Sequence, residues 1–468
     1  MKHKSDWGII GMGVMGTSLA RNMARNGLTV SLFNRHLEGL EEKVAAAKVT
    51  RYPELAQAQP FDALQAFVES LATPRKLLLM LPAGDAVAQM LTDLSDFIQE
   101  EDIIIDGGNS HFEDTQRRMN SGAVYAKNYL GMGISGGASG ALWGPSMMPS
   151  GNQQAYGVVA QDLEKIAAKT ASGTSCCTYI GAGGAGHFTK MVHNGMEYAE
   201  MQLIAEMYVF LRASKLSNAA ISTLFDTWSQ TASNSYLLSI SAAILKVKEG
   251  THDLIDLILD KAGNKGTGAW ATQIGAALGV SNSMMAAALY ARFNAADKKL
   301  RIQLSQLFDT SPKTPEIELD HLLHAYDFCR LINHYQGFRM LESASAEYRW
   351  GLELSAIANV WRSGCILKSE LMDRLFEKLK THSILEHPEF QSQLIHGFEA
   401  LKKVLRTGIS SNIPLPVCSA AQQFFLQMTQ EKGSAHLIQA QRDYFGAHRY
   451  QRLDDESGSF YHTDWENQ

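Results

Sequence analysis

One stretch of the sequence, GAGHFTKMVHNGMEYAEMQLIAE, gathers side chains that can exchange protons. At the helical repeat of about 100° per residue, it places on one face Lys190, His193, Asn194 and Glu197, with Tyr198 at the edge. An amine, an imidazole, an amide and a carboxylate side by side can serve as general base and general acid toward a bound substrate. The same row could also be an ordinary solvated face that carries an ion pair. Spacing alone leaves both interpretations open.

An acid–base lysine has to be neutral, although its reference pKa is about 10.4. Burial would lower the pKa of Lys190, and so would a nearby cation such as His193 if it is charged; Glu197 would raise it unless protonated itself. We therefore expect the lysine and the glutamate to titrate as a coupled pair. Gly195 lies in mid-helix, at a cost of about 1 kcal/mol relative to alanine. A ligand or a backbone segment that approaches closely would explain it.

A second motif, GMGVMG, lies at the start of the chain between an apolar segment at 7–10 and a helix-like segment. Its glycines permit a tight turn and close backbone approach, so that the helix N-terminus can hold a pyrophosphate. A purely structural turn is the alternative. The context favours a dinucleotide site that includes Gly11, Met12, Gly13, Val14, Met15 and Gly16.

The residues after the second apolar run, TVSLF, indicate which dinucleotide is bound. An NAD enzyme would place an acid there to accept from the ribose 2′-hydroxyl. This chain has Asn34, Arg35 and His36 instead, and the guanidinium of Arg35 can pair with a 2′-phosphate. The pattern favours NADP. Glu38 is the nearest acid to this position in the sequence, and it keeps NAD as the minority alternative.

The predicted secondary structure that must position these residues changes along the chain. The runs WGIIG, TVSLFN, KLLLML and DIIIDGGN alternate with helix-like segments, which is typical of a parallel sheet covered on both faces. Beyond about residue 180 the spacing is helical without strand alternation. We predict a dinucleotide-binding domain over 1–180, an all-helical substrate and dimerisation domain over 181–432, and a tail over 433–468. The tail is polar yet aromatic, which favours an arm that packs on another surface.

Composition narrows the class of protein. The 468 residues are 45% hydrophobic and 19% charged, as in globular proteins, and exceed what one core usually serves. A formal charge of −6 argues against nucleic acid as a partner. No apolar stretch approaches a membrane span, and no signal segment is recognised, so we expect a cytoplasmic protein. The five cysteines match no zinc spacing, and we expect free thiols and no metal.

KMVHNGMEY resembles the signature helix of the decarboxylating 6-phosphogluconate dehydrogenases. Further motifs of that family follow in order along essentially the whole chain: IIDGGNS at 104–110, ISGG at 134–137, NKGTG at 264–268, LYARF around Arg292 and QRDYFGAH at 441–448. The resemblance implies an α/β Rossmann-type domain followed by a large all-α domain and a C-terminal arm. It also implies NADP-dependent oxidative decarboxylation of 6-phosphogluconate to ribulose 5-phosphate and CO₂, in the pentose phosphate pathway.

The resemblance implies a role for each matched residue. Lys190 would accept the proton of the carbon-3 hydroxyl and later donate to the keto oxygen, and Glu197 would protonate carbon 1. The substrate's carboxylate and hydroxyls would be held by Asn109, Ser135, Gly136, Gly137, His193 and Asn194. Its phosphate would be held by Tyr198, Lys265, Thr267 and Arg292, with Arg442 and His448 from a tail that enters a neighbouring subunit. The cofactor would be held by Leu81, Pro82, Ala83 and Asn109 in addition to the glycine turn at 11–16 and the residues at 34–36. The functional unit would be a homodimer with shared active sites.

The chain departs from the family pattern mainly in the cofactor domain. Alanine is usual at Gly13, serine or threonine at His36, lysine at Pro82, and two acids at the positions of Ala138 and Ser139. We hypothesise that substrate recognition is kept while cofactor handling differs. Two alternatives remain. One is a non-decarboxylating β-hydroxyacid dehydrogenase, a class whose members are shorter than this chain, and the other is a catalytically silent NADP-binding regulator. The intact pair Lys190 and Glu197 weighs against the regulator.

Overall fold

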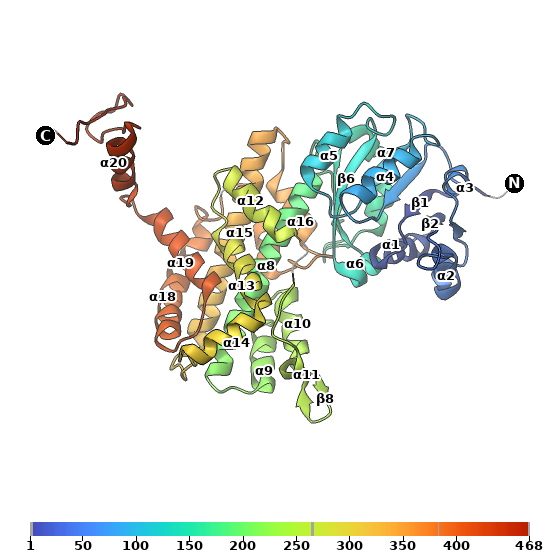
Figure 1. The fold of residues 1–468 in the computed structure, drawn as a ribbon. Helices are drawn as coiled ribbons and strands as arrows, with labels where there is room; N and C mark the ends of the chain where they lie inside the picture. The colour runs from blue at the N-terminus through green and yellow to red at the C-terminus, as the bar shows by residue number, and fades with distance from the viewer. Residues whose placement is uncertain (1–2, 264–265, 382, 467–468) are drawn as a thin grey trace. The chain divides into compact units, whose positions relative to one another are not determined.

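The structure, a computed structural model, describes residues 3–263, 266–381 and 383–466. The chain divides into two compact units, Met1–Ala421 and Gln422–Gln468. Figure 1 shows the course of the chain from a sheet-containing N-terminal region into a helical one.

A seven-stranded sheet forms the first region of the larger unit, in the order β3-β2-β1-β4-β5-β6-β7. Neighbouring strands are parallel except for β6 and β7, which are antiparallel. The apolar runs form fully buried strands, as expected for a sheet covered on both faces. The strands are β1 (Trp7–Ile10), β2 (Val30–Phe33), β3 (Gln59–Phe61), β4 (Lys76–Leu79), β5 (Ile103–Asp106), β6 (Tyr129–Ser135) and β7 (Ser146–Gly151).

Two clusters of buried side chains lie on opposite faces of this sheet, because successive strand residues point to opposite sides. Ile9 belongs to one cluster and Ile10 to the other, and Leu78 and Leu79 divide in the same way. The helices of this region are α1 (Val14–Arg25), α2 (Val44–Arg51), α3 (Leu64–Glu69), α4 (Asp85–Leu94), α5 (Phe112–Met119), α6 (Gly137–Trp143) and α7 (Gln153–Ile166), with a 3₁₀ turn at Pro53–Leu55.

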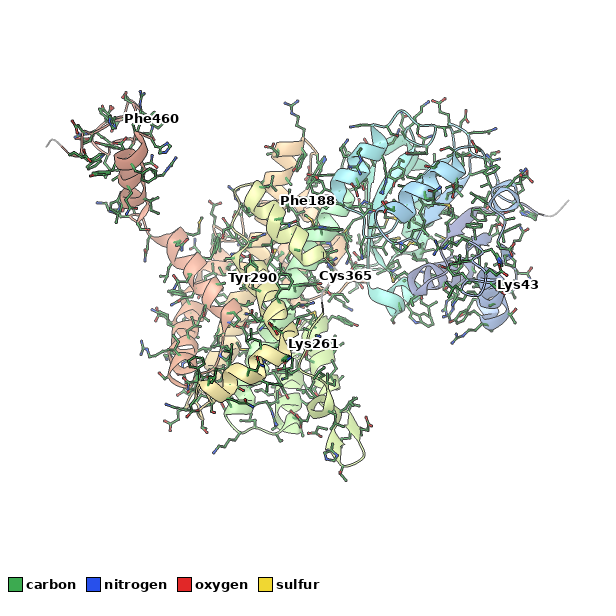
Figure 2. The ribbon with its side chains drawn as sticks, in the orientation of Figure 1. Lys43, Phe188, Lys261, Tyr290, Cys365 and Phe460 are labelled. Atoms are coloured by element: carbon green, nitrogen blue, oxygen red, sulfur yellow. The ribbon has the colours of Figure 1, made fainter. Side chains whose placement is uncertain are left out.

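The helical region is organised around the long helix α8 (Ala185–Ala213), which packs against β6 and β7 as well as other helices. Phe188 lies near the start of α8 (Figure 2). The Phe188 ring meets the rings of Phe112 and Trp350, each at a centroid distance of 5.2 Å. The other helices are α9 (Asn218–Trp228), α10 (Tyr236–Ile244), α11 (Leu254–Leu257), α12 (Thr267–Ala277), α13 (Ser283–Ala296), α14 (Lys298–Leu307), α15 (Leu319–Tyr348), α16 (Leu354–Trp361), α17 (Glu370–Lys378), α18 (Pro388–Ser410) and α19 (Pro416–Thr429).

This architecture confirms the predicted fold class of a parallel α/β domain followed by a large helical one. One local difference is a two-stranded hairpin, β8 (Lys248–Glu249) with β9 (His252–Asp253), in a region expected to be purely helical. Its strands are two residues long, too short to leave an alternating pattern in the sequence.

The second half of α8 carries a buried acid that holds another helix. The Glu206 carboxylate accepts hydrogen bonds from the backbone N–H groups of Val417 (2.9 Å) and Cys418 (3.0 Å), in the first turn of α19. A carboxylate there satisfies N–H groups that lack a partner within the helix. Burial nevertheless raises the pKa of Glu206 to about 7, since the hydrogen bonds only partly offset the loss of water.

The smaller unit is ordered around one aspartate. Its helix α20 (Ala435–Gly446) contains Asp443, which is inaccessible to solvent. The Asp443 carboxylate accepts hydrogen bonds from the backbone N–H groups of Arg449 and Thr463 and from the indole of Trp465, and it pairs with the His462 ring at 3.0 Å. These bonds lower the pKa of Asp443. The aromatic end of the chain therefore folds back onto α20.

Candidate active site

Lys190 lies on α8 where that helix crosses the end of β6. Its Nζ donates to the Ser135 hydroxyl at 3.0 Å and lies 3.4 Å from Nδ1 of His193. The close crossing depends on Gly133, because a Cβ there would lie 2.5 Å from the Lys190 Cβ. Lys190 is 8% exposed and His193 is fully buried. The row predicted from the helical spacing is therefore an interior row and not a solvated face.

The charges of this row are set mainly by burial. Burial lowers the pKa of Lys190, and the negative charges that Glu197 and Cys365 can carry oppose the shift. Burial, with the charge of Lys190 next, lowers the pKa of His193 well below its usual value. The imidazole is thus neutral at neutral pH and supplies no positive charge. Burial alone therefore lowers the pKa of Lys190, and the contribution expected from a charged His193 is absent.

Glu197 lies one helical turn beyond His193, with Oε2 3.7 Å from Nδ1. Burial raises the pKa of Glu197, while Lys190 and Arg292 act in the opposite direction. The two shifts favour a neutral amine and a protonated carboxyl, the forms needed for a general base and a general acid. The geometry therefore places a candidate base and a candidate acid on one helix face.

Gly195 has a different explanation from the expected one. A Cβ at this position would lie 2.9 Å from the Cβ of Ala271 on α12 and 2.9 Å from the sulfur of Met285 on α13. The close neighbours are side chains of packed helices and not a ligand or backbone. The glycine thus permits tight packing behind the reactive face.

A small hollow opens beside Lys190, between the sheet region and the helical region. Asn109, from the loop after β5, lines it together with Thr267, the first residue of α12. Several predicted substrate residues thus meet at one place from segments far apart in sequence. The lining comprises Asn109, Ser110, His111, Phe112, His187, Lys190, Met191, Asn194, Thr267 and Trp270.

The ISGG segment turns from β6 into α6 on the other side of Ser135. Gly136 and Gly137 have φ values of 113° and 61°, which favour glycine. A Cβ on Gly136 would lie 2.5 Å from the carbonyl oxygen of Gly364. Ala138 and Ser139 follow in α6, where the related proteins were expected to carry acids.

The residues predicted to hold a phosphate are only partly brought together. The Arg292 guanidinium lies over the Tyr198 ring, 3.4 Å from its centroid. Lys265 lies outside the described residues. Arg442 and His448 belong to the smaller unit, where both are exposed and Arg442 donates to the Gln439 side chain at 3.0 Å.

A cleft of about 780 Å³ lies at the carboxyl ends of β1, β2 and β4. The backbone N–H of Met12 donates to Asn34 Oδ1 at 3.0 Å, which joins the glycine turn to the end of β2. A Cβ on Gly11 would lie 2.5 Å from the carbonyl oxygen of Met80, whereas Gly13 has open space around it. Only Gly11 of these two is thus required for the turn, and the alanine usual in related proteins would fit at position 13. The cradle suits a dinucleotide.

The predicted cofactor residues lie in or beside this cleft. Its lining includes Gly11, Met12, Gly13, Asn34, Arg35, His36, Leu81 and Pro82. Val14, Met15 and Gly16 form the first turn of α1 and are not among the lining residues. Ala83 follows Pro82 in the same loop and is likewise not among them.

Sequence reasoning missed the acid that contacts Arg35. That acid is Glu41 and not Glu38: its carboxylate pairs with the guanidinium at 2.8 Å and accepts from the Asn34 amide at 2.8 Å. A turn in which the Leu37 N–H donates to the Glu41 carbonyl at 2.9 Å brings Glu41 back to the end of β2. No motif in the sequence signals this turn.

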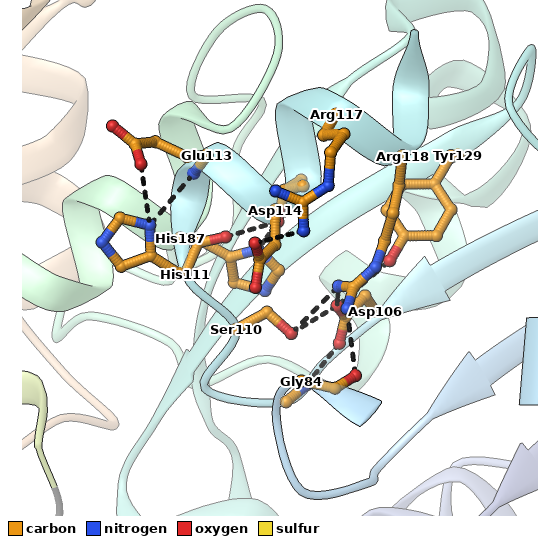
Figure 3. A network of polar contacts seen from close by, with 12 residues as sticks. Gly84, Asp106, Ser110, His111, Glu113, Asp114, Arg117, Arg118, Tyr129 and His187 are labelled. Carbon is orange, nitrogen blue, oxygen red and sulfur yellow. Dashed lines mark hydrogen bonds and ion pairs between the residues drawn. The ribbon is translucent and has the colours of Figure 1, made fainter. Parts of the chain in front are cut away.

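Other neighbours of the site also escaped the sequence analysis. The Trp361 ring meets His193 edge-on at 5.5 Å, and the buried His187 ring lies 2.7 Å from the Thr115 hydroxyl. Arg118, on α5, forms a buried ion pair with Asp106 at the end of β5 (Figure 3). These contacts depend on tertiary packing, which periodicity does not report.

The part of the chain that the structure describes contains neither a candidate metal site nor a membrane-spanning helix. Within it, no group of three or more His, Cys, Asp or Glu side chains could hold a metal ion. Among the same residues, no helix has the length and apolar character to cross a bilayer.

Comparison with known protein families gives matches over nearly the whole chain. Residues 6–181 match the family described as the NAD binding domain of 6-phosphogluconate dehydrogenase. Residues 186–465 match the 6-phosphogluconate dehydrogenase C-terminal domain.

Curated relatives and a solved structure resemble the chain along its full length. The chain is 39% identical to a decarboxylating 6-phosphogluconate dehydrogenase of Chlamydia pneumoniae, over 98% of this chain and 97% of that protein. It is 38% identical to the enzyme of that name from Escherichia coli K12, over 99% of each. The structure matches Plasmodium falciparum 6-phosphogluconate dehydrogenase with a TM-score of 0.92 and 35% identity, covering 98% of this chain and 100% of that one. That protein is described in its apo form, with NADP⁺ and with 6-phosphogluconate.

Proposed function

The chain belongs to the 6-phosphogluconate dehydrogenase family, and on this basis we propose that it oxidises and decarboxylates 6-phosphogluconate with NADP as the electron acceptor. The product is ribulose 5-phosphate, and the reaction belongs to the pentose phosphate pathway. One observation carries the proposal: the buried amine of Lys190 and the partly buried carboxyl of Glu197 share a helix face, and Lys190 lines a hollow together with Asn109 and Thr267.

Lys190 begins the reaction as a general base. Its lowered pKa favours the neutral amine, which accepts the proton of the carbon-3 hydroxyl. Bound NADP supplies the hydride acceptor for carbon 3. The resulting β-keto acid loses CO₂ once a proton donor faces its carbonyl oxygen, and the protonated Lys190 is that donor. Glu197 then protonates carbon 1, for which its raised pKa keeps a proton available.

The neighbouring polar groups hold the substrate in this register. The Ser135 hydroxyl already accepts from Lys190, and Asn194 lies one turn along the same helix. The carboxylate and hydroxyls of the substrate are assigned to Ser135 and Asn194 together with Gly136, Gly137, His193 and Asn109. Because His193 stays neutral, it orients these groups without repelling the protonated lysine.

The phosphate of the substrate is assigned to Tyr198, Thr267 and Arg292, with Lys265 of the NKGTG motif. Arg292 stays a cation at any physiological pH and can pair with phosphate oxygens through two N–H groups. Its stacking on Tyr198 limits where the guanidinium can lie.

NADP is assigned to the cleft of the sheet region. Gly11, Met12 and Gly13 offer the backbone for its pyrophosphate, and Asn34, Arg35 and His36 lie at the end of β2, where the adenosine ribose binds in this fold. Leu81, Pro82 and Ala83 follow β4 and would contact the nicotinamide side together with Asn109.

We further propose a homodimer in which the tail completes the partner's site with Arg442 and His448. The helical region exposes many large apolar side chains, as expected of a surface that packs against another chain. These are Leu257, Ile258, Leu259, Tyr290, Phe293, Leu300, Ile302, Leu304, Leu307 and Phe308. We also propose a cytoplasmic location, where the free thiols of the five cysteines would stay reduced.

Turnover of the purified protein tests the proposal. With 6-phosphogluconate and NADP, we expect NADPH and ribulose 5-phosphate to appear in equal amounts with release of CO₂. NADPH without CO₂ would favour a non-decarboxylating β-hydroxyacid dehydrogenase. NADP binding without any turnover would favour a catalytically silent regulator.

A further inference from the structure

We propose that Arg118 is a positioning residue that fixes the cofactor loop at 81–84 against the substrate loop at 107–111. The proposal rests on the assignment of these loops under the proposed function. Arg118 itself lines neither the cofactor cleft nor the substrate hollow, and it lies outside every motif used to recognise the family. Figure 3 shows its guanidinium between Asp106, Ser110 and Gly84.

The guanidinium makes contacts on both sides of the junction. On the substrate side, Nη1 donates to Asp106 Oδ2 at 3.1 Å and lies 3.5 Å from the Ser110 hydroxyl. On the cofactor side, Nη2 donates to the carbonyl oxygen of Gly84 at 3.3 Å. One planar group therefore joins the end of β5 to the residue that precedes α4.

Asp106 is the fixed point of this arrangement. It is fully buried, and its Oδ2 accepts from the hydroxyls of Ser110 at 2.6 Å and Tyr129 at 3.1 Å. Its Oδ1 accepts from the backbone N–H of Gly108 at 3.1 Å. Asn109 is thus held between two residues that are both tied to the same carboxylate.

The two loops also touch through their backbones. A Cβ on Gly108 would lie 2.7 Å from the carbonyl oxygen of Leu81, so that only glycine permits the approach. The Gly107 N–H donates to the Leu79 carbonyl at 2.9 Å just before this point. Any shift of the cofactor loop would therefore move Asn109, and any shift of Asn109 would move the cofactor loop.

The functional consequence concerns the register of the two ligands. Hydride transfer needs carbon 3 and the nicotinamide in near contact, and a misplacement of about 1 Å can reduce the rate by about 10²-fold. Leu81 and Pro82 line the cofactor cleft, whereas Asn109 lines the substrate hollow. Arg118 joins the two without taking part in the chemistry.

The variants must separate positioning from folding. Arg118→Met alone leaves the buried Asp106 carboxylate without its ion pair and can prevent folding. Arg118→Lys keeps the charge, but one ammonium cannot reproduce the two-sided contact. The double variant Asp106→Asn/Arg118→Met removes both charges. Arg117→Met is the matched control, because Arg117 is the preceding residue on α5, is exposed and pairs with Asp114.

The measurement is the dissociation constant of NADPH, followed by its fluorescence, with and without 6-phosphogluconate. These two ligands are both in reduced form and cannot react, so binding is read without turnover. We expect binding of each ligand to strengthen that of the other in the wild type, with a coupling in the typical range of about 5–150-fold. The coupling should fall toward one in Arg118→Lys and in the double variant, and stay intact in Arg117→Met. A primary isotope effect with substrate deuterated at carbon 3 should rise in the same two variants.

A purely structural role would reduce the amount of folded protein and leave coupling and isotope effect unchanged in the fraction that folds. Wild-type turnover with equal coupling in Arg118→Lys and Arg117→Met would overturn the positioning role and leave the proposed function intact. NADPH binding without wild-type turnover would overturn the proposed function, while the coupling would still decide the role of Arg118. Wild-type protein that binds neither ligand would overturn both.

Discussion

Nζ of Lys190 donates to the Ser135 hydroxyl at 3.0 Å, which joins α8 to the last residue of β6. This bond fixes the amine at the carboxyl edge of the sheet, the edge at which α/β folds bind their ligands. The buried amine has a lowered pKa and no carboxylate within ion-pair distance among the described residues. Such an environment suits a proton acceptor better than a structural cation.

Lys190→Met should therefore lower kcat by about 10²–10⁴-fold, because it removes the proposed general base and later proton donor. Binding of 6-phosphogluconate should change much less, since the remaining polar groups stay in place. Steady-state kinetics and equilibrium binding of the substrate would measure the two effects. Lys165→Met, on the exposed face of α7, is the control and should behave as the wild type. Unchanged kcat in Lys190→Met would refute the assignment.

Glu197→Gln should alter the shape of the pH–rate profile as well as its height. Under the proposed mechanism the active form has a neutral Lys190 and a protonated Glu197, so the wild type should lose activity on both sides of its optimum. Glutamine cannot lose a proton, and the alkaline limb should vanish while the acid limb remains. We expect kcat to fall by about 10²-fold or more. A profile that keeps both limbs would exclude Glu197 as the group behind the alkaline limb.

Arg35→Met should weaken NADP binding and leave NAD binding nearly unchanged. The guanidinium pairs with Glu41 and is largely exposed, so a 2′-phosphate can compete for it. Loss of a charge-assisted contact of this type corresponds to about tenfold or more in KM for NADP. Arg51→Met on α2 is the control. Equal effects on KM for NADP and KM for NAD would mean that Arg35 does not read the 2′-phosphate.

Glu206→Gln should make the stability of the protein less dependent on pH. The folded pKa of Glu206 is about 7 and the unfolded value is near 4.5, so between these values the unfolded chain binds fewer protons. Stability is therefore lost as pH rises through this window, by about 3 kcal/mol from this group. Glutamine cannot ionise and should not show the loss. Urea unfolding at about pH 5 and about pH 8 would measure it, with Glu347→Gln on the surface of α15 as the control.

Mixing two inactive variants would test the shared active site. Lys190→Met and Arg442→Met should each be nearly inactive as homodimers. After unfolding and refolding together, a heterodimer would contain one site with neither change, because Lys190 and the tail come from different subunits. About half of the dimers would be heterodimers, and about a quarter of the wild-type activity should return. No recovery would show that the tail serves its own subunit.

Sequence patterns predicted the elements whose signals are local. The runs around Ile9, Leu32, Leu78 and Ile104 became buried strands because branched apolar residues without polar alternation suit a sheet covered on both faces. The helical spacing also placed Lys190 and Glu197 on one face, and Lys190 and Asn194 of that face line the hollow.

What could not be predicted depends on contacts between distant segments. Glu41 reaches Arg35 through a turn, and Arg118 reaches Gly84 across two loops, with no spacing rule to reveal either. Gly195 shows a second limit, because the sequence signals a close approach without saying what approaches. Its neighbours are Ala271 and Met285, from helices that packing alone brings there.

The carboxylate of Asp443 gives the C-terminal arm a conformation of its own. Its bonds to Arg449, Thr463 and Trp465 order the chain that follows α20 through contacts within the smaller unit alone. An extended arm would lose backbone and side-chain freedom on docking, whereas a prefolded one has lost most of it already. In the proposed homodimer, subunit exchange would then resemble the docking of rigid bodies, and a change at position 443 would weaken assembly by unfolding the arm.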